Sequence, residues 1–250
     1  MAVERKPRIA LLIDADNSPA KKIDLIINEL STLGETNIRR AYGNWTKSGL
    51  SGWAEHLHEW AIRPVQIYDY SRGKNASDMA MAVDAMALLY TDRPDAFGIV
   101  SSDADFTPLV MHLRERGAAV YGFGQQKTPQ PFVSACSRFL FLDQLSVDDQ
   151  EADDEESAPT RKLRVPTARL KRDAALVNLL RHAVLSAADE SGWARISAVG
   201  GQIGNQSSFD ARNYGYASLS KLLAATQLFD FKDEGTSAVA VRDRREDRAG

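Results

Sequence analysis

Apolar positions in the first part of the chain fall into two patterns that alternate. Short runs without polar residues, such as Ile9-Ala-Leu-Leu-Ile13, are typical of strands buried on both faces of a parallel sheet. Apolar residues at helical spacing follow, at Ile23, Ile26, Ile27 and Leu30. The repeated order predicts an α/β fold with a doubly wound, mainly parallel sheet, because right-handed crossovers return each helix to a sheet face. We expect strands at residues 9–13, 37–42, 65–68, 97–100, 118–122 and 138–142, and helices at 19–34, 50–60, 78–90, 108–117 and 131–137.

The second part of the chain begins with two blocks of opposite charge. Seven of the nine residues at 148–156 are acidic, and six of the twelve at 161–172 are basic. Such blocks stay solvated, so they indicate a linker. Beyond it, the apolar spacing predicts short helices at 176–185, 196–203 and 216–225, followed by a two-stranded wing at 229–231 and 238–241. We therefore expect a first domain at 1–145, a linker at 146–168, a smaller winged-helix domain at 169–243 and a tail at 244–250.

Aspartates stand where the first and fourth expected strands end. Asp14 closes the first strand, and Asp103 and Asp105 follow the fourth. Open α/β sheets bind ligands at the carboxyl ends of their strands, so these side chains should share a crevice. A polar loop that contains Lys74 would bring Asp78 to the same edge.

A simpler explanation exists for each of these aspartates. Asp103 or Asp105 could cap the following helix, and Ser77 could be the N-cap of a helix whose first turn holds Asp78. Asp84 lies about 120° further round that helix and should point elsewhere. The histidines are not expected at the strand ends, since His56 and His58 lie on a helix distant from them in sequence.

Four carboxylates cannot all stay ionised in one crevice without positive charge. A ligand set made only of oxygen favours Mg²⁺ or Mn²⁺ over zinc. Such ions support phosphoryl transfer, in which Lys74 could contact the phosphate.

Composition narrows the class of protein. The formal net charge of −3 provides no overall positive field, so contact with nucleic acid must use local patches. The lone cysteine, Cys136, excludes an internal disulfide framework and is expected in the core. The first eight residues lack the apolar segment of a secretory signal, and no uncharged run reaches the ~20 residues of a membrane span. We expect a cytoplasmic protein with no membrane partner.

Three acidic motifs in residues 9–142 resemble the NYN domains of the LabA-like group, within the PIN-like nucleases. They are Asp14-Ala-Asp-Asn17, Lys74-Asn-Ala-Ser-Asp78 and Ser101-Ser-Asp-Ala-Asp-Phe106. Asp16 and Ser102 depart from the usual pattern, because glycine is common at both positions.

The resemblance implies a Mg²⁺- or Mn²⁺-dependent endoribonuclease that acts on single-stranded RNA. It implies that Asp14, Asp78, Asp103 and Asp105 are the catalytic and metal-binding residues. We assign Asn17, Lys74, Ser101 and Ser102 to substrate binding.

Residues 170–241 resemble the OST-HTH or LOTUS domain, a winged helix often joined to NYN domains. The motifs that carry this resemblance include Gly192-Trp-Ala-Arg-Ile-Ser-Ala-Val-Gly200 and Phe209-Asp-Ala-Arg-Asn-Tyr-Gly-Tyr216. The resemblance implies RNA binding or a protein partner. Arg212 and Lys221 are the candidates for phosphate contact.

Two other functions fit parts of the sequence. Asp14-Ala-Asp16 has the DxD form of haloacid dehalogenase phosphatases, in which the first aspartate is the nucleophile. Ser18 and the unexplained Asp78 motif argue against that reading. The protein could also be a non-catalytic RNA-binding or regulatory protein that works through its second domain.

Overall fold

The computed structural model describes residues 5–68, 75–144, 164–206, 208–233, 235–236 and 238–245. The chain divides into two compact units, Met1–Asp143 and Gln144–Gly250, and each is considered by itself. Lys74, most of the expected linker and the end of the expected tail lie outside the described residues.

Within the described residues of the first unit, six strands form one parallel sheet in the order β3-β2-β1-β4-β5-β6. The strand order reverses direction at the central pair β1 and β4, as it does in doubly wound folds. The predicted fold class is confirmed. The strands are β1 (Arg8–Asp14), β2 (Glu35–Gly43), β3 (Arg63–Gln66), β4 (Ala96–Val100), β5 (Ala119–Gly124) and β6 (Arg138–Phe141).

The register places the two central strand ends side by side. Ile13 pairs with Val100, so the next residues, Asp14 and Ser101, lie side by side at the carboxyl edge of the sheet. On the other side, Asp14 pairs with Tyr42 of β2. Asp14 thus stands at the carboxyl end of β1, where the sequence predicts it.

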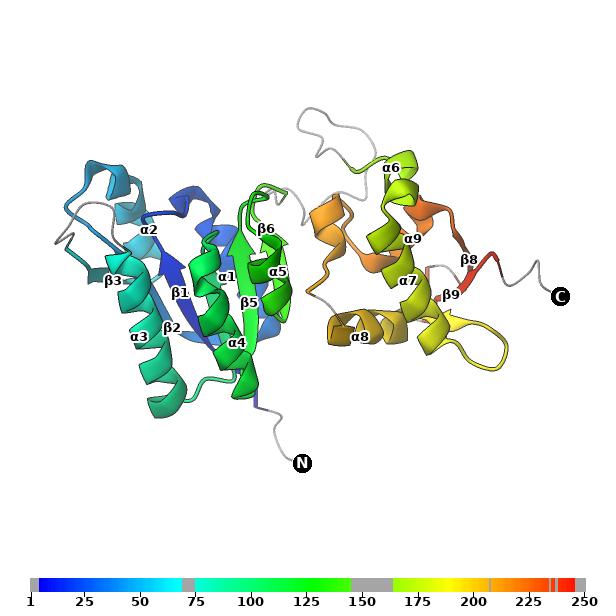
Figure 1. Cartoon of the computed structure of the whole chain (residues 1–250), viewed down its shortest axis with the longest axis horizontal. Coiled ribbons are helices and arrows are strands. Elements are labelled where there is room, and N and C mark those ends of the chain that lie inside the picture. The colour runs from blue at the N-terminus through cyan, green and yellow to red at the C-terminus, as the bar shows by residue number, and fades with distance from the viewer. Residues whose placement is uncertain are drawn as a thin grey trace. The chain divides into compact units, whose positions relative to one another are not determined.

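Helices cover both faces of the sheet. One buried cluster joins α3, α4 and α5 to strand residues such as Leu12 and Ile99, and Figure 1 shows α3 and α4 on the same side of the strands. On the opposite face Leu30 of α1 lies against Gly98 and Leu11. The helices are η1 (Ala20–Lys22), α1 (Ile23–Leu33), η2 (Ser48–Trp53), α2 (Ala54–Glu59), α3 (Ala76–Thr91), η3 (Ala104–Phe106), α4 (Thr107–Glu115) and α5 (Gln130–Ala135).

The helix expected at 50–60 differs from the prediction. Its first part is the 3₁₀ helix η2, and only residues 54–59 are α-helical. Gly49 and Gly52 fall in the 3₁₀ part, where glycine's conformational freedom weakens an α-helix. Leu50 and Trp53 are nevertheless buried, as their spacing predicts.

The second unit has the helices and wing that the sequence predicts. Its described part contains α6 (Thr167–Arg172), α7 (Ala174–Ala187), α8 (Ile196–Gln206), η5 (Ala211–Tyr214) and α9 (Leu219–Thr226). Strands β8 (Phe229–Lys232) and β9 (Ala240–Asp243) form the antiparallel wing, and the short β7 (Ala194–Arg195) pairs with β9.

Three details of the second unit correct the sequence analysis. The tyrosyl hydroxyl of Tyr216 donates to the carbonyl of Val165 over 2.8 Å, and Leu170 of α6 is fully buried, so residues 165–168, expected in the linker, belong to the folded second unit. The strand β7 was not expected, because two residues carry no readable alternation. Leu185, expected on the apolar face of its helix, is 63% exposed.

None of the helices in the described ranges is long and apolar enough to cross a membrane.

Candidate functional site

Asp14 is the buried carboxylate of the strand-end site. Asp14 is 1% exposed, and its Oδ2 atom accepts a hydrogen bond from the Ser101 hydroxyl over 2.9 Å. The Asn17 side-chain amide donates to Oδ1 over 3.2 Å and to Oδ2 over 3.0 Å. Burial raises the pKa of Asp14, and the bonds from Asn17 and Ser101 act against that rise. Asp14 is therefore held in one orientation.

Asp103 and Asp105 lie in the turn after β4. Asp103 is the N-cap of η3, where its Oδ1 atom accepts from the backbone N–H of Asp105 over 2.9 Å. The backbone N–H of Asp103 donates to the Ser101 hydroxyl over 3.1 Å. The exposed Asp105 accepts from the Asn75 side chain over 3.0 Å. The capping explanation thus applies to Asp103, and its second carboxylate oxygen is still available as a ligand.

Asp78 faces the other carboxylates from the first turn of α3. Its pKa is raised to about 6, first by partial burial and then by the negative charges of Asp14, Asp103, Asp105 and Asp16. Three segments far apart in sequence therefore direct negative charge toward one region.

Ser77 does not cap α3 as the sequence suggested. The N-cap is Asn75, and the Ser77 hydroxyl donates to Asp16 over 2.8 Å. The Asp16 carboxylate also forms an ion pair with Lys47 at 3.5 Å. Asp16, which stands where glycine was expected, thus links β1 to α3 and to the segment before η2.

The strand-end carboxylates fit a divalent cation by their chemistry. All are hard oxygen donors. Burial and then the negative charges of its neighbours raise the pKa of Asp78, and a cation would offset that repulsion. Among the described residues the strand-end carboxylates do not form a group of three with ligand atoms all within 4.8 Å, whereas Asp24, His56 and Glu59 do.

The other predicted site residues of the first unit contact the strand ends in different ways. Asn17 is exposed and orients Asp14, and Ser101 is 1% exposed and does the same. The Ser102 hydroxyl accepts from the backbone N–H of Gln125 over 2.8 Å, which joins the ends of β4 and β5. Asp84 points away as expected, toward Arg40 and Tyr42 of β2.

In the second unit, Arg212 forms a bidentate ion pair with Asp210. Its Nε atom donates to Oδ1 over 3.0 Å and its Nη2 atom donates to Oδ2 over 2.9 Å. This ion pair holds the guanidinium against η5. Lys221 lies exposed in the first turn of α9.

A cleft of about 870 Å³ adjoins the strand ends. Asp16, Asn17, Lys47 and His56 are among the residues that line it. His56 of α2 thus lines the same cleft as the loop after β1, although the two are far apart in sequence. Sequence reasoning missed His56 because no motif links it to the acidic residues.

Comparisons with known proteins match both parts of the chain. A family model of the NYN domain matches residues 8–143, and one of the OST-HTH/LOTUS domain matches residues 171–240. An uncharacterized protein of Methanocaldococcus jannaschii is 34% identical over 123 residues, which are 48% of each chain. The chain thus spans about half the length of that relative.

Two solved structures are also similar. A protein of unknown function from Vibrio parahaemolyticus has 20% identity and a TM-score of 0.47, over 56% of this chain and 96% of that one. An uncharacterized protein from Nitrosomonas europaea has 23% identity and a TM-score of 0.26, over 40% and 92%.

Proposed function

The chain belongs to the NYN domain family and carries an OST-HTH/LOTUS domain after it, and from this premise we propose that it is a metal-dependent ribonuclease acting on single-stranded RNA. NYN domains are generally nucleases, and PIN-like nucleases typically use divalent metals. The observation that carries the proposal is the convergence of Asp14, Asp78 and Asp103 at the switch point of the sheet. The match to the NYN family also favours a nuclease over the haloacid dehalogenase phosphatase alternative.

We assign the metal-binding and catalytic role to Asp14, Asp78, Asp103 and Asp105. When bound there, Mg²⁺ or Mn²⁺ supplies positive charge that stabilises the phosphoryl transition state and lowers the pKa of the attacking water. Asn17 and Ser101 keep the Asp14 carboxylate oriented, and the Ser102 hydroxyl holds the neighbouring strand end. Lys74, outside the described residues, would contribute a charge to the phosphate.

Attack by water on phosphorus expels the 3′-oxygen of the RNA. The products should therefore carry a 5′-phosphate and a 3′-hydroxyl, without a cyclic phosphate. We propose that the second domain binds RNA, with Lys221 as a phosphate contact and Arg212 contributing from its ion pair, and that the same domain can engage a protein partner.

The test is Asp103→Asn in the full chain. Asparagine has nearly the same volume and can still accept the capping bond from Asp105, so the fold should persist. Losing one carboxylate should slow cleavage of labelled single-stranded RNA by about 100-fold or more, the equivalent of a few kcal/mol of transition-state stabilisation. Cleavage is measured in Mn²⁺, Mg²⁺ and EDTA, followed by end-group analysis.

Asp92→Asn is the matched control, because it removes one carboxylate at the opposite end of α3. It should cleave like the wild type. Equal cleavage by the Asp103→Asn variant would point to a contaminating nuclease, and cyclic-phosphate ends would refute the proposed chemistry. RNA binding without cleavage by the wild type would favour the regulatory alternative.

A further inference from the structure

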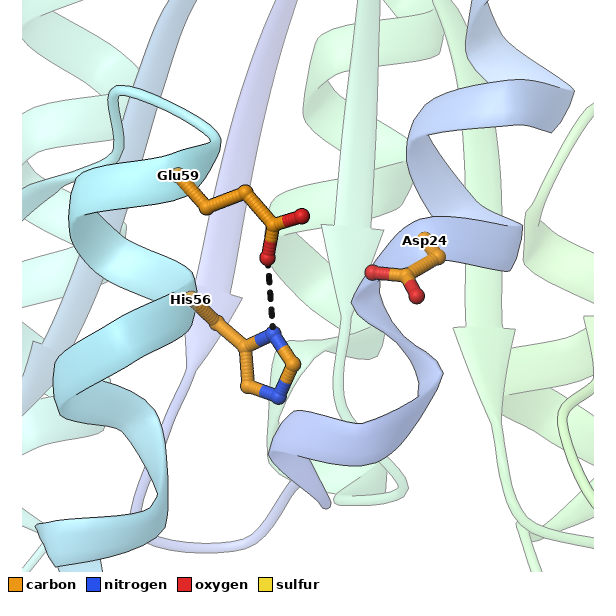
Figure 2. Close-up of side chains that lie close together, drawn as sticks. All are labelled: Asp24, His56 and Glu59. Atoms are coloured by element: carbon orange, nitrogen blue, oxygen red, sulfur yellow. Dashed lines mark ion pairs between the residues drawn. The ribbon is translucent and has the colours of Figure 1, made fainter.

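Three side chains with metal-binding groups converge between α1 and α2, apart from the strand-end carboxylates. They are Asp24 in the first turn of α1, and His56 and Glu59 on α2. One ligand atom from each lies within 4.8 Å of the other two. Figure 2 shows the Asp24 carboxylate directed across the gap between the helices toward the other two side chains.

The local structure keeps these groups together. His56 and Glu59 are three residues apart on α2, so they share one face of the helix. The indole N–H of Trp60 donates to Oδ1 of Asp24 over 3.0 Å, and the Trp60 carbonyl accepts from the Arg39 guanidinium over 2.8 Å. A hydrogen bond of this kind orients a ligating carboxylate and leaves its second oxygen for a cation.

The imidazole of His56 has one ring nitrogen without a hydrogen-bond partner. This atom, Nδ1, is buried. Oε2 of Glu59 lies 3.6 Å from this nitrogen, which is too long for a hydrogen bond. Two carboxylates and a neutral imidazole carry a charge of −2, so one divalent cation would balance the group and satisfy Nδ1.

We propose that Asp24, His56 and Glu59 form a second metal site, selective for a transition metal of the Zn²⁺ class. Imidazole nitrogen together with carboxylate oxygen favours Zn²⁺ over Mg²⁺, in contrast to the all-oxygen strand ends. Side-chain exposures of 25% for His56 and 59% for Glu59 leave both groups free to close on an ion. Three protein ligands leave a coordination position for an oxygen ligand, and His56 lines the cleft beside Asp16 and Asn17.

The experiment measures binding of Zn²⁺ and Co²⁺ to the full chain, purified without a histidine tag. Titration calorimetry should give one Zn²⁺ site that excess Mg²⁺ does not displace, and Co²⁺ should acquire visible absorption typical of nitrogen and oxygen ligands. His56→Asn and Glu59→Gln should each weaken Zn²⁺ binding by at least about tenfold, since each removes a ligand. Both positions are partly exposed, and a melting curve for each variant verifies the fold.

Two controls separate this site from its neighbours. His58→Asn removes the exposed histidine on the same helix, and Asp103→Asn alters the strand-end site; both should bind Zn²⁺ like the wild type. Unchanged binding by the His56→Asn and Glu59→Gln variants would overturn the proposal, as would loss of the site in the His58→Asn or Asp103→Asn variant. Displacement of Zn²⁺ by Mg²⁺ would refute the proposed selectivity. Ribonuclease activity is not part of this readout, so the two proposals can fail separately.

Discussion

At the scale of single residues, Asp14 and Asp78 differ in how their charge is compensated. Asp14 is more buried, but Ser101 and Asn17 donate hydrogen bonds to it. The pKa of Asp78 rises because burial and neighbouring carboxylates both disfavour its charged form. Asp78 should therefore be the carboxylate whose ionisation most opposes folding without a cation.

This difference predicts a pH-dependent effect of Asp78→Asn. The pKa of Asp78 is raised to about 6 in the folded chain from its ordinary value of 3.8, so the folded state binds its proton more tightly than the unfolded state. Ionisation of Asp78 therefore lowers the free energy of unfolding as pH rises from about 4 to 6. Above that interval the decrease stays constant. In EDTA, the melting temperature of the Asp78→Asn variant should increase relative to the wild type across that interval.

Asp78→Glu is the companion variant, because it keeps the charge and should keep the wild-type pH dependence. A difference between the Asp78→Asn variant and the wild type that does not vary with pH would contradict this account of Asp78.

At the scale of elements, the close approach of β5 and β6 depends on Gly122. A Cβ atom there would lie 2.4 Å from Cδ2 of Phe139 and 2.7 Å from Sγ of Cys136. Both neighbours are buried, and Phe139 packs edge-on against Phe132 at 5.8 Å between ring centroids. The cluster has little room to shift, since protein interiors are close-packed.

Gly122→Ala should accordingly lower the free energy of unfolding by about 1–3 kcal/mol, the usual cost of overpacking a core. Urea denaturation measures the change. Gly49→Ala is the control, because a Cβ atom there meets nothing within 4 Å. It should alter the free energy by no more than about 0.5 kcal/mol. Equal effects of the two substitutions would show that the β5–β6 contact tolerates a methyl group.

At the scale of the whole molecule, the two units have separate cores. One is built on the parallel sheet, and the other joins α6, α7, α8 and α9 to the wing. Each core consists of residues from its own unit, so each unit has what independent folding requires.

We therefore expect residues 1–144 and 164–250 to fold when expressed separately. Each piece should melt cooperatively, and the sum of the two melts should match that of the full chain. Limited proteolysis of the full chain should first cut between residues 145 and 163, in the linker proposed from its charge pattern. A first cut inside either core, or a piece that fails to fold, would refute this division.

The pattern of apolar and polar residues was enough to predict the order of the main strands and helices in the first unit, the doubly wound sheet and the meeting of Asp14 with the turn after β4. These features depend on local periodicity and on the rule that parallel strands end at one edge, both readable without coordinates. The polar loop before its helix suggested the same edge for Asp78, and the family motifs supported that placement.

The contacts between side chains of different elements could not be predicted from the sequence and depend on how the folded chain packs. Ser77 contacts Asp16 instead of capping its helix, Ser101 turns inward to Asp14, and His56 comes to the cleft beside Asn17. Asp24 reaches His56 because α1 is anchored by its own buried residues and α2 continues from η2, whose Leu50 and Trp53 are buried. Such contacts depend on how helices are placed on the sheet, and a pattern of apolar residues specifies the buried face of a helix without specifying its polar neighbours.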